Sequence, residues 1–216
     1  MEIEAYAGMQ TVPDGHSSHL RIDNYGALVG HDWVGKYATA VRRGYGFAYP
    51  TAVTGITWAA LTVTNQYMII NPPGSNRIFV PLRIRMGYVS ATNVAGNISM
   101  YEFPVNSIIG TNASVVSYTA LAARPLLVGG GNASKMIFTA ATNTIVGTPT
   151  HIMPIISLAA MQATTAVAPF ILDSGDLDGM VQFLPGTAMV LAGNAAVAMV
   201  SSCICFGLEI PLPAGV

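Results

Sequence analysis

Two long stretches of this chain, residues 136–172 and 179–208, contain no charged side chain. Uncharged runs of this length are typical either of membrane-spanning helices or of strands buried in a β structure. Proline, glycine, asparagine and glutamine interrupt both runs, and Ala, Val and Thr fill them rather than the Leu and Phe that favour membrane insertion. We therefore expect no membrane span and a chain of deeply buried strands.

The scarcity of charge extends to the whole protein, because only 9% of its 216 residues are charged. An ordinary soluble domain has about 25% charged residues, which cover its surface. We therefore expect neighbouring subunits to hide much of this surface, and we predict a homo-oligomer, with a trimer favoured. The net charge of −1 provides no field that would attract nucleic acid, so no specific nucleic-acid partner is expected.

The beginning of the chain differs in character from the rest. Residues 1–50 hold nine of the nineteen charges and three of the four histidines, among many Gly and Asp turn signals. This composition predicts an extended arm over residues 1–44 that attaches the protein to a neighbour, and a folded body over residues 45–216. The acidic start, Met-Glu-Ile-Glu, lacks the layout of a secretory signal, so synthesis in a host cytoplasm is expected.

The body consists of short β-like runs with turn signals about every 8–15 residues, a spacing typical of a sandwich. We predict an all-β, jelly-roll-like antiparallel sandwich with the N-terminal arm extended from it. Tight turns are expected at Pro73-Gly74, Pro185-Gly186 and Gly193-Asn194. The expected strands cover residues 55–63, 67–71, 78–89, 97–103, 180–184, 187–191 and 196–210.

Alternation within two of these strands predicts which side chains face the core. In residues 78–89, Phe79 shares its parity with Arg83 and Arg85, so all three are expected on the outer face. In the closing strand, the bulkier set Val200, Ser202, Ile204 and Phe206 is expected in the core. The reduced thiols of Cys203 and Cys205 are then expected on the opposite face, against a neighbouring subunit or a second layer.

The sequence contains two clusters of possible metal ligands, and each allows a metal-binding and a structural interpretation. His16 and His19 lie near Asp14 and Asp23 and could hold a metal, or could be solvated side chains in the arm. The acidic segment with Asp173, Asp176 and Asp178 could bind calcium, or could be an acidic turn at the end of a strand; its spacing does not match an EF-hand.

No catalytic constellation is present in the sequence. Residues 129–135 resemble a phosphate-binding loop, but the glycine required before Lys135 and the Ser or Thr required after it are absent. We therefore predict no catalytic, cofactor-binding or metal-binding residues and no enzymatic activity. Arg77, Arg83 and Arg85 are expected to pair with carboxylates across an interface, or else to form ion pairs within the chain or a solvated strand face.

Two segments resemble small structural proteins encoded by bacteriophages. The turn Asn71-Pro72-Pro73-Gly74-Ser75-Asn76-Arg77 and the strand after it are similar to their "NPAGSGK" turn, with Asn-Arg in place of Gly-Lys. Residues 183–196 and the ending Glu209-Ile210-Pro211 are similar to their "PPGxALAL" strand and "WEEIP" tail, without its Trp and one of its acidic residues. The resemblance implies a trimeric jelly roll like that of tumour necrosis factor, on the phage particle, and implies no catalytic residues.

The sequence thus predicts a structural protein of a bacteriophage virion, most consistent with a capsid decoration, that contacts other virion proteins through the arm. One alternative is the receptor- or glycan-binding head of a tail fibre, in which exposed aromatics stack on sugars. Another is a cupin-like metalloenzyme, for which the expected strands offer only His151 and Glu102. The candidate stacking aromatics are Trp33, Tyr37, Tyr45, Phe47, Tyr49 and Trp58.

Overall fold

A computed structural model describes residues 37–58, 60–61, 67–90, 96–104, 120–129, 132–140, 149–158, 171–177, 179–193 and 199–212. The chain divides into two units, residues 1–39 and 40–216, and the strands all belong to the second. The predicted boundary at residue 44 therefore stays a prediction. Among the described residues, no helix has the length and apolar character needed to cross a membrane.

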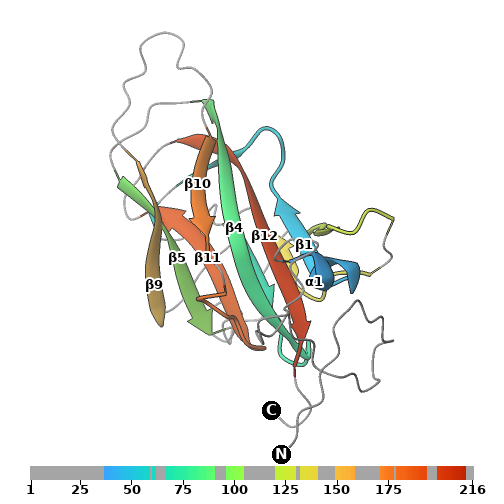
Figure 1. Ribbon diagram of the computed structural model, residues 1–216. Coiled ribbons are helices and arrows are strands. Elements are labelled where there is room, and N and C mark those ends of the chain that lie inside the picture. The colour runs from blue at the N-terminus through green and yellow to red at the C-terminus, as the bar shows by residue number, and fades with distance from the viewer. Residues whose placement is uncertain are drawn as a thin grey trace, which may run out of the picture. The chain divides into compact units, whose positions relative to one another are not determined.

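The described elements are one short helix and twelve strands (Figure 1). In chain order they are α1 (Ala38–Arg42), β1 (Gly46–Pro50), β2 (Ile56–Thr57), β3 (Tyr67–Asn71), β4 (Arg77–Ser90), β5 (Gly96–Pro104), β6 (Ala120–Leu121), β7 (Arg124–Pro125), β8 (Ile137–Thr139), β9 (His151–Leu158), β10 (Ile171–Asp176), β11 (Thr187–Gly193) and β12 (Val200–Pro211).

Eight of the strands pair in a nested order, first with last. Strand β1 pairs with β12, β3 with β11, β4 with β10 and β5 with β9, all antiparallel. Two further pairings, β4 with β12 and β5 with β11, join these ribbons into two sheets. The sheet orders are β10-β4-β12-β1-β7, with β2 on β12, and β6-β8-β3-β11-β5-β9. This winding is a jelly roll, so the predicted all-β antiparallel sandwich is confirmed. Residues 1–36 of the predicted N-terminal arm lie outside the described residues.

The main core lies between the two sheets and is rich in aromatic rings. Tyr49 contacts Phe79 and Phe138 edge to face, with ring centroids 5.4 and 5.7 Å apart. The hydroxyl of Tyr67 donates a hydrogen bond to the Tyr49 carbonyl at 2.5 Å, and the Trp58 indole donates to the Ser201 hydroxyl at 2.6 Å. The polar atoms of these buried rings are thus satisfied inside the sandwich.

The expected alternation in β4 holds for its second half only. Arg83 and Arg85 point outward as predicted, but Phe79 is fully buried in the core, contrary to the prediction. The pairing with β12 shifts its register between Phe206 opposite Arg83 and Gly207 opposite Pro81. A bulge of this kind reverses the parity of the residues beyond it, which brings Phe79 to the inner face.

The predicted orientation of the closing strand is wrong. Cys203 and Cys205 are buried in the core, whereas Ile204 and Phe206 lie partly exposed on the outer face of the sheet. The physical reason is volume, because Tyr67 of the facing sheet and Tyr49 of the adjacent strand β1 extend into the core beside β12 and leave room only for small residues. Both thiols are free, as predicted, but they lie inside the sandwich.

Turns and strand limits confirm some expectations and correct others. Gly74 and Gly186 have φ values of +78° and +87°, as the Pro-Gly turns predict. Only Ile56–Thr57 forms a strand within the described part of residues 55–63. Residues 180–184 are not a strand; they contribute one bridge, Phe183 to Phe79, because the chain turns at Gly179, with φ +76°. The expected turn at Gly193-Asn194 extends outside the described residues.

Candidate functional site

The outward sides of both sheets carry apolar side chains at their centres. All five residues of β3 are buried, and Tyr67 and Ile69 belong to the main core. Met68 and Ile70 point to the other side, where they form a second buried cluster with residues of β5 and β11. Members of this outer cluster are Met68, Ile70, Tyr101, Phe103, Ala188, Val190 and Ala192, and Leu61 and Ile137 pack against it.

The outward side of the first sheet shows the same tendency. Ile204 lies between Arg85 and Pro50 in register, and Phe206 lies between Arg83 and Ala48. A sheet of a solvated sandwich alternates apolar inward residues with polar outward ones. Both sheets of this protein depart from that pattern at their central strands.

Charge on the outward side of the first sheet is neutralised within the chain. The Arg83 guanidinium binds Asp173 through two nitrogens, with Nε 2.9 Å from Oδ1 and Nη2 2.5 Å from Oδ2. Arg85 Nε donates to the same carboxylate at 3.0 Å. The hydrogen bond from Arg83 is the main cause that lowers the pKa of Asp173 to about 2. Of the alternatives for these arginines, the structure therefore contains the pairing within the chain.

The acidic segment belongs largely to a strand and not to a loop. Asp173 and Asp176 lie in β10, opposite Arg85 and Arg83, with an irregularity of register between them. Asp178 and the candidate ligands His16 and His19 lie outside the described residues, as do Asp14 and Asp23. In the described ranges, no three of His, Cys, Asp and Glu converge as a metal would need.

Glu209, near the end of β12, is a buried carboxylate whose importance the sequence did not reveal. Its side chain is 2% exposed and accepts hydrogen bonds from the Tyr49 hydroxyl at 2.7 Å, the Ser134 hydroxyl and the Lys135 backbone N–H at 2.8 Å. Burial, and then the neighbouring Glu209 carboxylate, raise the pKa of Tyr49, which keeps the phenol protonated as a donor. The segment that resembles a phosphate loop is therefore anchored by an internal anion.

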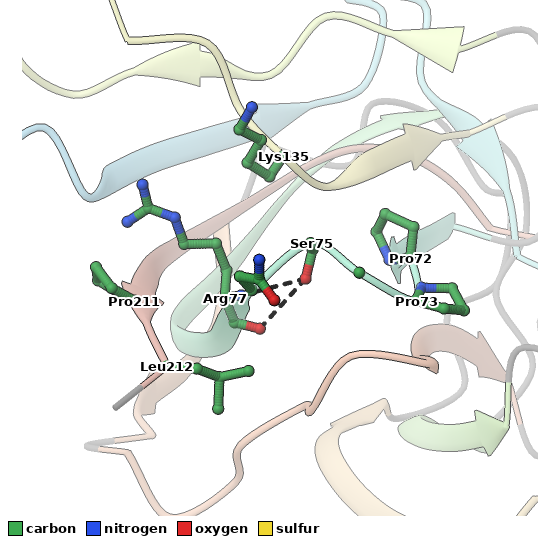
Figure 2. Close-up of a pocket in the computed structure, with 9 residues that line it drawn as sticks. Pro72, Pro73, Ser75, Arg77, Lys135, Pro211 and Leu212 are labelled. Carbon is green, nitrogen blue, oxygen red and sulfur yellow. Dashed lines mark hydrogen bonds between the residues drawn. The ribbon is translucent and has the colours of Figure 1, made fainter. Parts of the chain in front are cut away.

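The Pro-Pro-Gly turn borders a hollow of about 600 Å³ beside this cluster (Figure 2). Buried Asn71 shapes the turn, because its amide donates to the carbonyls of Arg77 and Phe183, both at 2.8 Å. Figure 2 shows Arg77 and Lys135 on the side of the hollow away from Pro72 and Pro73. The Arg77 guanidinium also lies 5.4 Å from the centre of the Tyr45 ring.

The chemistry of this hollow is limited by its lining. The described residues that line it include two cations and no carboxylate, histidine or cysteine that could act as a general base. Lys135 is exposed, and Arg77 donates to the Glu209 backbone carbonyl at 3.4 Å. Two exposed or partly exposed cations beside three prolines are typical of a solvated surface and do not by themselves indicate a binding site.

The aromatic residues proposed as sugar-stacking platforms lie mostly inside the protein. Phe47, Tyr49 and Trp58 are 0–2% exposed and belong to the main core, so they cannot stack on a ligand. Tyr45 is partly buried and contacts Arg77, and Trp33 lies outside the described residues. The aromatic argument for a glycan-binding head is therefore wrong for half of its residues.

Comparison with known proteins adds no identity, since no family model, no curated protein and no solved structure matches this chain.

Proposed function

We propose that this protein is a structural component of a bacteriophage virion, made in the host cytoplasm, and that it assembles as a homo-oligomer, with a trimer favoured. The observation that carries the proposal is the apolar outward side of β12, where Ile204 and Phe206 lie partly exposed, whereas the outer cluster of the second sheet is already buried within the chain. Cover by other protein would remove this apolar surface from water. Only 9% of the residues are charged, so the chain has few charged side chains with which to shield apolar surface from water.

The outward side of β12 is the proposed contact between subunits. Ile204 and Phe206 stand beside Arg83 and Arg85, which both donate to Asp173, so a partner that covers this side meets arginines that already have a carboxylate within the chain. Interfaces of obligate oligomers are likewise apolar at their centres and depleted in unpaired charge. The resemblance of the Pro-Pro-Gly turn and of the chain ending to phage structural proteins supports the virion as the place of assembly.

Light scattering combined with size-exclusion chromatography tests the oligomer. We expect the wild-type protein at micromolar concentration to have the mass of an oligomer, and the double variant Ile204→Asn/Phe206→Asn to dissociate. The matched control is Val53→Asn/Val128→Asn, since these valines are 91% and 98% exposed, and it should keep the wild-type mass. A monodisperse wild-type monomer would refute the assembly.

Antibody labelling tests the virion role separately. Antibodies raised against the purified protein should label intact phage particles in negative-stain electron microscopy and should detect the chain in banded particles. If the chain is found only in the soluble fraction of infected cells, the virion assignment is wrong even where the oligomer forms.

A further inference from the structure

A second hollow, of about 520 Å³, lies between the edges of the two sheets, and its lining includes three methionines and a histidine. Strands β5 and β9 line one side, and residues 180–183, which follow β10, line the other.

Strand register brings four of the lining side chains together. Met100 lies opposite Met153, and Glu102 lies opposite His151, in the antiparallel pair β5–β9. Positions two apart on a strand share a face, and Cβ atoms of opposite residues are about 4.5–5.5 Å apart. Two thioethers, one imidazole and one carboxylate therefore adjoin on one face of this ribbon, and Met180 lines the hollow from the facing segment.

We propose that this hollow binds a soft monovalent metal ion, Cu(I) or its redox-inert analogue Ag(I), through the sulfurs of Met100, Met153 and Met180 and the imidazole of His151. Thioether sulfur is a poor ligand for hard cations and a good one for Cu(I). A single carboxylate in the lining is too few for calcium or magnesium, which need several oxygen ligands.

The position of Glu102 assigns the nitrogen that the metal would use. His151 Nε2 lies 3.7 Å from Glu102 Oε2, so Nδ1 is the ring nitrogen left for a ligand bond. Carboxylates commonly orient metal-binding imidazoles in this way. Glu102 is therefore a positioning residue, whereas His151 is a ligand.

Exposure is also consistent with a site that loads from solvent. Met100 is 3% exposed and forms the inner end, whereas Met180 and His151 are 72% and 82% exposed at the outer end. Met100 also belongs to the main core, whereas Met180 lies exposed at the rim of the hollow.

The test follows methionine methyl resonances of the full chain, labelled with ¹³C at the ε-methyl groups, during titration with silver nitrate in chloride-free buffer. Silver at one equivalent should shift the resonances of Met100, Met153 and Met180 and leave the other eight of the eleven methionines in place. This readout is separate from any reaction of the buried thiols Cys203 and Cys205. Calcium at the same concentration should shift none.

Isosteric and positioning variants make the outcome decisive. Met153→Leu preserves volume and should abolish the shifts at Met100 and Met180, and Glu102→Gln should weaken silver binding about tenfold. The matched control Met68→Leu, on the opposite face of the second sheet, should bind silver as the wild type does. The proposal is overturned if silver leaves the three methyl groups unshifted, if all eleven shift alike, or if Met153→Leu retains the wild-type response.

Discussion

Replacement of Glu209 by glutamine tests whether the buried carboxylate holds the end of the jelly roll together. The glutamine side chain would keep one carbonyl oxygen for the hydroxyls of Tyr49 and Ser134. Its amide nitrogen would face the Lys135 N–H, which now donates to Oε2 at 2.8 Å, so two donors would meet. The substitution removes one charge-assisted hydrogen bond and weakens two others.

The size of the effect follows from these contacts. A hydrogen bond to a charged group contributes about 1.5–3 kcal/mol, and removal of the charge recovers part of its desolvation cost. We expect Glu209→Gln to lower the free energy of unfolding by about 2 kcal/mol, which for a domain of this size lowers Tm by about 4–8 °C. Tyr49→Phe removes one donor only and should cost about 1–1.5 kcal/mol.

Differential scanning calorimetry at fixed protomer concentration measures these shifts, since the Tm of an oligomer depends on concentration. Tyr45→Phe is the matched control, because its partly buried ring contacts Arg77 through the ring face and its loss of a hydroxyl should change stability by less than about 0.5 kcal/mol. If Glu209→Gln melts within about 1 °C of the wild type, the carboxylate does not anchor the loop.

Two further substitutions test packing and charge. A Cβ at Gly207 would lie 2.5 Å from the buried Phe79 ring, so Gly207→Ala should destabilise the protein by about 1–3 kcal/mol, measured by urea unfolding. In the control variant Gly87→Ala, the added Cβ meets only the Ser202 hydroxyl at 3.0 Å, so this substitution should destabilise the protein less. Because Arg83 lowers the folded pKa of Asp173 to about 2, the pair contributes stability above the unfolded pKa of about 4 and loses it as the pH falls toward 2. Asp173→Asn should therefore cost about 0.5–1 kcal/mol at pH 7 and clearly less near pH 2, where the folded carboxyl is half protonated, and an equal cost at both values would contradict this account.

Local signals in the sequence were sufficient where backbone chemistry decides the structure. Pro-Gly dipeptides predicted positive φ values at Gly74 and Gly186, since only glycine adopts that conformation without strain. The burial of Glu209 was missed because a carboxylate is usually exposed, and only its surroundings in the sequence could have indicated otherwise. It is the first charged residue after thirty uncharged ones, inside a strand pattern. A charge in such surroundings is costly to bury and needs internal donors.

The closing strand shows why the candidate interface could not be found from alternation alone. Alternation identifies two faces of a strand, but the choice between them depends on the volume that the opposite sheet leaves free. Tyr67 of the facing sheet and Tyr49 of the adjacent strand β1, both distant from β12 in sequence, occupy the core there and select the small side chains of Cys203 and Cys205 for the inside. The larger apolar residues of β12 are thereby turned outward. In a chain with so few charges, these outward apolar side chains are the ones that we propose a partner covers.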